Sequence, residues 1–137
     1  LMWAHYANDH KGMCIEFSRE SGTELADEEA IRPIHYTNNH PTLSTQSLKS
    51  QESIEASMKR ILYAKSEHWE YEQEWRHIID VGDKLHPWPA PLKTVYFGCK
   101  TEPDDIQLVK TVLNNNKLKY MRAKQSDSKF SLMFEPV

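Results

Sequence analysis

The residues best suited to chemistry lie in one short segment, from His68 to Asp80, which contains two tryptophans, one tyrosine, three glutamates and one arginine. Read as a strand from about Glu72, the segment places Glu72, Glu74 and Arg76 on one face, because side chains two residues apart on a strand point the same way. The opposite face, which we expect to pack, carries Trp75, His77 and Ile79. Two carboxylates and a guanidinium would therefore share one surface.

Glu72 and Glu74 have the spacing of a carboxylate pair that acts on one ligand. Side chains two residues apart on a strand lie about 7 Å from each other, so both reach one ligand without having to share a proton. On a ligand with a nucleotide-linked ribose, one carboxylate could hold a ribose hydroxyl through an oxocarbenium-like transition state while the other orients the nucleophile. The alternative is a solvated strand face on which both glutamates pair with Arg76 or a neighbouring lysine.

Aromatic and basic residues around this pair are the candidate binding residues. Trp69 and Tyr71 precede the strand and could wall a pocket by stacking on a flat ring, although aromatic residues near a strand usually belong to the core. Arg76 could bind a phosphate, or it could satisfy Glu74 or a backbone carbonyl.

A second concentration of candidate residues lies near the start of the chain, at His5 and Tyr6. His5 could be a general acid or base, or a hydrogen-bonded structural histidine. His5 and His10 are five residues apart, as are His35 and His40, and this spacing puts neither pair on one face of a helix or strand. We therefore predict no metal site.

The composition disfavours several classes of function. With 17 Lys and Arg against 20 Asp and Glu, the formal charge of −3 provides no basic field that would attract nucleic acid. No run of about 18 apolar residues is present, so we expect no membrane span. Cys14 and Cys99 form no C-x-x-C pair, which suits a reducing, cytoplasmic location. A basic group near the end of the chain is typical of a protected edge strand and contains Lys117, Lys119, Arg122 and Lys124.

The elements that must position these residues alternate between helix and strand. Helices are predicted from Leu1 to Ala7, from about Ser47 to Lys65, and after Thr101, whose hydroxyl would cap the third helix. The middle helix has an apolar stripe that consists of Ile54, Met58, Ile61 and Leu62. Strands are predicted at residues 13–17, 33–36, 92–98, 118–123 and 130–134, and in the segment from residue 72. This order predicts an α/β (α+β) fold, a mixed sheet of about five strands flanked by about three helices.

The length of 137 residues suits a single domain spanning residues 1–137. The chain opens on an apolar helical pattern, with no initiator methionine and no capping residue before it. We therefore expect it to be the C-terminal fragment of a longer protein.

Two sequence patterns carry a resemblance to a known family. The pattern W-x-H-Y-A at residues 3–7 and the pattern Y-E-x-E-W-R at residues 71–76 occur together with the strands at 13–17 and 95–98. This combination resembles the proteins of bacteria and their viruses that are called "domain of unknown function 2971". The resemblance runs over essentially the whole chain, and it implies a shared fold without an established activity.

Glu72-Gln73-Glu74 is also similar, more distantly, to the Glu-x-Glu at a strand start of arginine-directed ADP-ribosyltransferases. That resemblance implies NAD as the cofactor, Glu74 on the nicotinamide ribose and Glu72 positioning the acceptor. The chain departs from those enzymes because it shows no upstream arginine strand. It also shows no Ser-Thr-Ser strand, for which Ser44-Thr45-Gln46-Ser47 is a poor substitute.

Two hypotheses follow. In the first, this is a bacterial or phage protein that consumes NAD or transfers ADP-ribose in a defence or toxin system, with Glu74 and Glu72 as the catalytic residues. Its small-molecule or nucleotide ligand would be bound by His5, Tyr6, Trp69, Tyr71 and Arg76. In the second, the same residues form a structural polar network in a non-catalytic interaction or sensor domain. A pocket that Glu72, Glu74 and His5 reach together would favour the first hypothesis. Burial of Trp69, Trp75 and Arg76 in a sealed cluster would favour the second.

Overall fold

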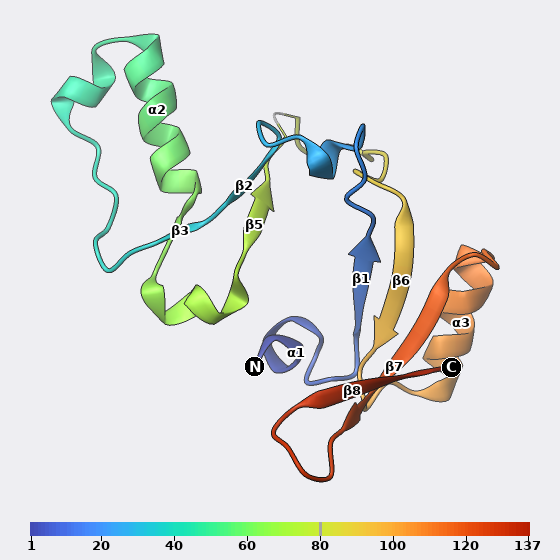
Figure 1. The fold of residues 1–137 in the computed structure, drawn as a ribbon. Helices are drawn as coiled ribbons and strands as arrows, with labels where there is room; N and C mark the ends of the chain where they lie inside the picture. Colours follow the sequence, from blue (N-terminus) through green and yellow to red (C-terminus); the bar gives the residue numbers. More distant parts are fainter. Residues whose placement is uncertain (80) are drawn as a thin grey trace. The chain divides into compact units, whose positions relative to one another are not determined.

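The computed structural model describes residues 1–79 and 81–137, so Asp80, at the end of the predicted chemical segment, lies outside the described residues (Figure 1). The contacts divide the chain into two compact units, one formed by Leu1–Glu20 and His86–Val137 and the other by Ser21–Leu85. Helices and mixed sheets occur together, which confirms the α+β class. A single domain over residues 1–137 stays a prediction.

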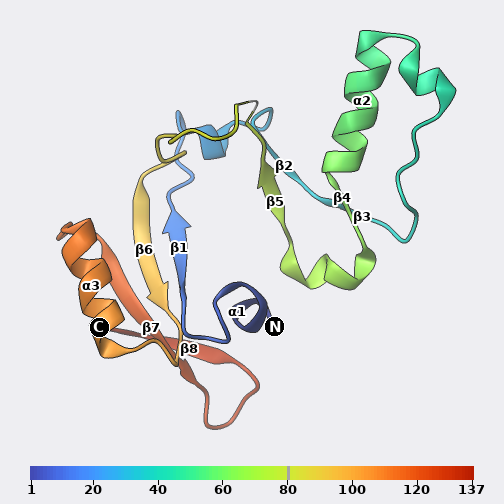
Figure 2. The same ribbon diagram turned by 180° about the vertical axis from the view of Figure 1, so that it is seen from behind.

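The first unit is built on a four-stranded mixed sheet (Figures 1 and 2). Its strands, in spatial order, are β1 (Met13–Phe17), β6 (Leu92–Phe97), β7 (Lys119–Gln125) and β8 (Leu132–Pro136). β6 and β7 are parallel, whereas the β1–β6 and β7–β8 pairs are antiparallel. Helix α3 (Pro103–Leu113) provides the crossover that parallel neighbours require. It packs on the sheet through a core of Val95, Phe97 and Ile106 with Val109, Leu113 and Tyr120 around it.

The start of α3 differs from the predicted cap. Glu102 is the N-cap residue, and its side chain makes no capping hydrogen bond. Thr101 instead donates its hydroxyl to the carbonyl oxygen of Gly12, 3.0 Å away, and is 4% exposed. The predicted Thr101 cap is therefore wrong, because a tertiary hydrogen bond holds this hydroxyl. The helix begins with Pro103 in its first turn and ends at Asn114, which has a left-handed conformation at the C-cap. Both residue types are favoured at these positions.

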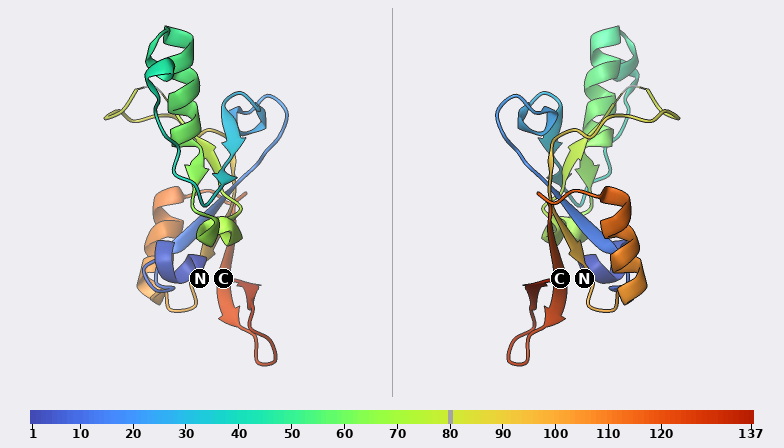
Figure 3. Two further views of the ribbon diagram at one scale, coloured as in Figure 1. Left: turned by 90° about the vertical axis from the view of Figure 1, so that its left-hand side faces the viewer. Right: turned by 90° about the vertical axis from the view of Figure 1, so that its right-hand side faces the viewer.

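The predicted edge strand is an internal strand. β7 lies between β6 and β8, because the chain folds back through residues 126–131 into a β7–β8 hairpin, which Figure 3 shows from two sides. Arg122 donates hydrogen bonds to the carbonyl oxygens of Cys99 and Thr101, at 3.1 and 2.9 Å. Lys124 pairs with Glu135 on the neighbouring strand. Arg122 and Lys124 of β7 thus make structural contacts, the first to the loop before α3 and the second to β8.

A constrained loop joins helix α1 (Met2–Tyr6) to β1. Asn8, Asp9 and His10 all have positive φ, at 46°, 51° and 68°, a conformation that costs free energy in residues other than glycine. Backbone hydrogen bonds hold the loop, including one from Lys100 N to His10 O at 3.0 Å. Gly98 is required at this contact, since a Cβ there would lie 1.9 Å from His10 O.

The second unit contains two small sheets and helix α2. β2 (Ile31–Pro33) pairs antiparallel with β5 (Trp75–His77), and β3 (His35–Tyr36) pairs parallel with β4 (Ala64–Lys65). The strands predicted to share one sheet are thus divided among three sheets. The 3₁₀ helices of this unit are Glu24–Ala26, Thr45–Leu48 and Glu67–Glu72.

Helix α2 (Gln51–Leu62) is shorter than the predicted helix. Ser50 and Ser53 form a capping box that sets its first turn, and the chain then turns into β4 at Ala64. The predicted apolar stripe is largely exposed, with exposures of 36% at Ile54 and 45% at Met58. In the described residues, no helix combines the length and apolar character that a membrane span requires.

Candidate functional site

The segment that carries the two glutamates begins as a helix. A 3₁₀ helix runs from Glu67 to Glu72, with the Ser66 side chain accepting a hydrogen bond from His68 N at its start. Gln73 then adopts a left-handed conformation with φ of 48°, and its backbone N–H and side-chain amide both bond to Glu70 O. The strand begins only at Trp75. The predicted strand start at Glu72 is wrong because this local turn satisfies the backbone first.

The two carboxylates nevertheless meet, at an atom that the sequence did not single out. The Lys65 ammonium contacts Glu72 Oε2, and it also contacts Glu74 Oε2 at 2.9 Å. Arg76 Nε donates to the other oxygen of Glu74 at 2.8 Å. These four residues form an ionic network, in which Glu72, Glu74 and Arg76 lie together as predicted and Lys65 is the unpredicted centre.

The network favours the charged forms of Glu74 and Lys65. Burial alone would raise the pKa of Glu74, but hydrogen bonds from Lys65 and Arg76, together with their positive charges, outweigh it and lower that pKa. Burial alone would lower the pKa of Lys65, but the hydrogen bonds that its ammonium donates to Glu72 and Glu74, together with their negative charges, raise that pKa. The Glu72 side chain is only 4% exposed. A carboxylate with a lowered pKa is a poor proton donor near neutral pH, so Glu74 is unsuited to general-acid chemistry.

Further hydrogen bonds connect the network to the neighbouring backbone. Glu74 N donates to the Tyr36 hydroxyl at 2.8 Å, and Ile34 N donates to Glu74 O at 2.9 Å. Arg76 Nη1 donates to Leu62 O, at the last residue of α2. The network therefore links the end of α2 and the β3–β4 pair to the segment that leads into β5.

The aromatic residues of the segment are divided between two environments. The Lys65 ammonium lies 5.2 Å from the centre of the Trp69 ring, and the Trp69 and Tyr71 rings are 6.0 Å apart. The Trp69 ring therefore borders the network, and the Tyr71 ring lies beside Trp69. Trp75 is 47% exposed, and so is Ile79, which contradicts the expected packing face. The reason is that β5 belongs to a two-stranded sheet, which gives that face little cover.

His5 and Tyr6 belong to the other unit. They are neighbours on α1, their rings are 6.3 Å apart, and Tyr6 is 61% exposed. Five predicted site residues thus gather in the Ser21–Leu85 unit, and two lie in the unit that contains α1.

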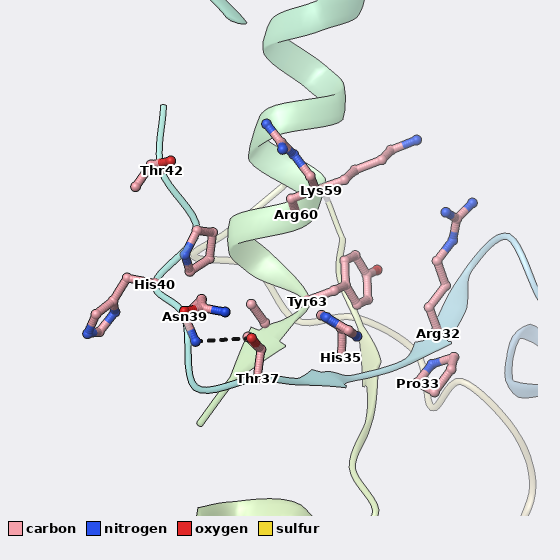
Figure 4. A pocket seen from close by; sticks show the side chains of 12 residues that line it. Arg32, Pro33, His35, Thr37, Asn39, His40, Thr42, Lys59, Arg60 and Tyr63 are labelled. Atoms are coloured by element: carbon pink, nitrogen blue, oxygen red, sulfur yellow. Dashed lines mark hydrogen bonds between the residues drawn. The ribbon is translucent and has the colours of Figure 1, made fainter. Parts of the chain in front are cut away.

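A hollow of about 500 Å³ lies beside the end of α2 and the β3–β4 pair (Figure 4). The hollow and the network use opposite faces of this pair. Strand alternation explains this division. His35 and Ala64, which pair across the two strands, line the hollow, whereas Tyr36 and Lys65, the next pair, point to the network. The other walls come from β2, from the end of α2 and from the segment after β3. They consist of Arg32, Pro33, Thr37, Asn39, His40, Pro41, Thr42, Lys59, Arg60 and Tyr63.

Positive charge dominates the lining of this hollow. The residues that line the hollow include Arg32, Lys59 and Arg60, and none of these lining residues is an aspartate or a glutamate. Arg32 pairs with Glu29, and Arg60 donates to Ser57 Oγ at 3.1 Å. The sequence reasoning missed these residues. The available signal was a Lys-Arg pair one helical turn before Tyr63, but a charged helix end commonly has no further role.

One comparison with known proteins gives a match. The family model described as "Protein of unknown function (DUF2971)" matches residues 2–77. The chain belongs to the DUF2971 family. No curated protein and no solved structure matches the chain.

The DUF2971 match includes α1, β1 and the whole ionic network, and it ends at the last residue of β5. It also includes every residue that lines the hollow beside α2. Within residues 1–79 and 81–137, no group of three or more His, Cys, Asp and Glu side chains is placed to hold a metal ion.

Proposed function

We propose that the Ser21–Leu85 unit is a non-catalytic binding or sensor domain, in which the hollow beside α2 receives the ligand and the ionic network holds its walls. The observation that carries this proposal is that Lys65 and Arg76 already occupy the carboxylates of Glu72 and Glu74. A catalytic pair would have to release these partners before touching a substrate. That release would leave a carboxylate that is 4% exposed without its counter-charge, which is costly.

The network has a direct structural connection to the hollow. Lys59, Arg60 and Tyr63 project from the end of α2, and this end is fastened through Arg76 to Leu62 O. Backbone hydrogen bonds from His35 N to Tyr63 O, at 2.7 Å, and from Thr37 N to Lys65 O, at 2.9 Å, fix the same end to β3. When a ligand binds to a site on rigid elements, little free energy is spent on ordering the protein, and this suits a binding domain.

The experiment that tests this proposal compares turnover with stability. The full chain and its Glu74→Gln variant are incubated with NAD labelled in the nicotinamide, with Glu28→Gln as a control at an exposed carboxylate. We expect no release of nicotinamide by any of the three proteins and a lower Tm for Glu74→Gln alone. Release by the wild type that disappears in Glu74→Gln, at unchanged Tm, would contradict the proposal.

A second candidate function is the NAD-consuming or ADP-ribosyl-transferring activity of the first hypothesis. The observation that favours it is that Glu72 and Glu74 converge on one atom, Lys65 Nζ, as a pair acting on one ligand must. In this candidate Glu74 holds the ribose and Glu72 positions the acceptor, while Trp69 and Tyr71 border the site. The same labelled-NAD experiment decides between the two functions.

A further inference from the structure

We propose that the hollow beside α2 binds a nucleoside monophosphate, with Lys59 and Arg60 contacting the phosphate and the Tyr63 ring contacting the base. This inference rests on the proposed binding function and names the chemical class of its ligand. Two features of the hollow support it. Lys59 and Arg60 line the hollow without carboxylate partners among the described residues, and Tyr63 provides an aromatic ring in the same wall. The hollow lies on the face of the β3–β4 pair that the ionic network does not use.

The hollow has an excess of positively charged side chains, although the protein as a whole has a negative net charge. The chain carries a formal −3, yet Lys59 and Arg60 line a cavity whose lining set contains no carboxylate. In the part of the chain that the structure describes, the Lys59 ammonium has no carboxylate partner. Among residues 1–79 and 81–137, the side-chain partner of Arg60 is a hydroxyl, Ser57 Oγ. Both cations are therefore available to an anion from solvent.

The helix dipole does not account for this surplus. Cations near a helix C-terminus offset the partial negative charge of the last carbonyls, which amounts to about half an elementary charge. Arg76 already brings a full positive charge to Leu62 O. Tyr63 N bonds to Lys59 O and Ile61 O, so further carbonyls at this end have their own donors. Lys59 and Arg60 thus exceed what the helix end needs.

The remaining walls suit a flat ring attached to the anion. Figure 4 shows Tyr63 at the end of α2, with His35 and Pro33 on the strand segment that crosses below it. Aromatic and proline side chains present flat apolar surface, and stacking on an aromatic side chain is tolerant of base identity. The volume of about 500 Å³ lies within the range of small-molecule sites, roughly 300–1,000 Å³.

A phosphate monoester fits this charge better than a carboxylate does. It carries nearly two negative charges near neutral pH and several acceptor oxygens, so two cations can bind it at the same time. Arg60 can donate two parallel hydrogen bonds to such a group, and Lys59 can act as a point charge. Arg32, which is held by Glu29, lies at the far wall and adds to the field.

The test is isothermal titration calorimetry on the full chain. The probes are the four common nucleoside monophosphates, the matching nucleosides and inorganic phosphate. We expect at least one monophosphate to bind, and its nucleoside to bind at least tenfold more weakly because charge-assisted hydrogen bonds are lost. Lys59→Gln/Arg60→Gln should weaken nucleotide binding at least tenfold. Lys49→Gln/Lys84→Gln, which removes the same charge at exposed positions, should change binding less than twofold.

Two further variants separate the parts of the proposal. Tyr63→Leu should weaken nucleotide binding and leave the affinity for inorganic phosphate unchanged. Glu74→Gln should weaken nucleotide binding less than Lys59→Gln/Arg60→Gln does, under conditions where circular dichroism shows it folded, because Glu74 supports the walls of the hollow and does not line it. No binding of any monophosphate at millimolar concentration, or equal binding by wild type and Lys59→Gln/Arg60→Gln, would overturn this inference. Binding abolished by Glu74→Gln but kept by Lys59→Gln/Arg60→Gln would place the ligand at the carboxylates. Together with turnover of NAD, that result would overturn the proposed function itself.

Discussion

Replacement of Lys65 by methionine tests whether the ionic network is structural. Methionine keeps most of the apolar stem of lysine and removes the ammonium that contacts both Glu72 and Glu74. Glu72 is 4% exposed and would then be a nearly buried carboxylate without its counter-charge. Glu74 would retain Arg76. The loss should therefore come mainly from Glu72.

The burial of the pair sets the expected size of this loss. Removing one partner of a fully buried ion pair costs about 3–5 kcal/mol, whereas exposed pairs contribute about 0–1 kcal/mol. The Lys65 side chain is 21% exposed, so water reaches one end of the pair and reduces the cost. We expect Lys65→Met to lower the free energy of unfolding by about 2 kcal/mol.

The assay is urea denaturation followed by tryptophan fluorescence, to which Trp69, in contact with the Lys65 ammonium, contributes a local signal. Lys84→Met, at an exposed position of the same unit, serves as the control and should shift stability by less than about 0.5 kcal/mol. In a Glu72→Gln background the cost of Lys65→Met should fall below about 1 kcal/mol, because the buried charge is already gone. The structural role of the network would be refuted if Lys65→Met lowered the free energy of unfolding by the same amount in the Glu72→Gln background as in the wild type. It would also be refuted if Lys65→Met did not lower the stability of the wild type.

Three further predictions concern the unit that contains α1. Hydrogen bonds, first that from Lys93, lower the pKa of Glu16 to about 2. Because the pKa of Glu16 is lower in the folded state, its ionised carboxylate stabilises the fold at pH values above the unfolded-state pKa, and this stabilisation is lost as the pH falls. The wild type should therefore have a higher Tm than Glu16→Gln at neutral pH, and the difference should vanish between about pH 4.5 and pH 2. Gly98→Ala should destabilise by about 2 kcal/mol through its backbone clash, whereas Gly82→Ala, in open space, should be nearly neutral in thermal melts. Thr101→Val should cost about 1 kcal/mol in urea denaturation and Thr101→Ser much less, because only serine keeps the hydroxyl bond.

Local patterns in the sequence predicted most of the first unit because its elements are long enough to show their period. β1 has the predicted bounds, Met13–Phe17, and α3 follows Thr101 as the third predicted helix does. Apolar alternation and helical spacing can each be recognised within a short stretch of sequence, so the prediction does not depend on residues far away in the chain. The Thr101 cap failed for the converse reason, since its hydroxyl bonds to Gly12, 89 residues away.

The second unit was harder to predict because its strands have two or three residues. A two-residue strand such as β3 has no period, and its pairing with β4 depends on a connection of 27 intervening residues that includes α2. This pairing also decides the chemistry. It places Lys65 among the glutamates and sends His35 to the other side, toward Lys59 and Arg60. No pattern local to residues 68–80 contains that information.

The carboxylate pair shows that residue spacing can predict a spatial arrangement without deciding its chemistry. Strand alternation predicted that Glu72 and Glu74 act together, and they do so although Glu72 ends a 3₁₀ helix and Gln73 is left-handed. Two ionised carboxylates that converge on one point are stabilised by a positive group there, whether it belongs to a substrate or to the protein. Here Lys65 provides it, seven and nine residues before the glutamates. The Glu-x-Glu spacing therefore predicts a cation-binding pair, and the origin of the cation determines whether that pair stabilises the fold or acts on a ligand.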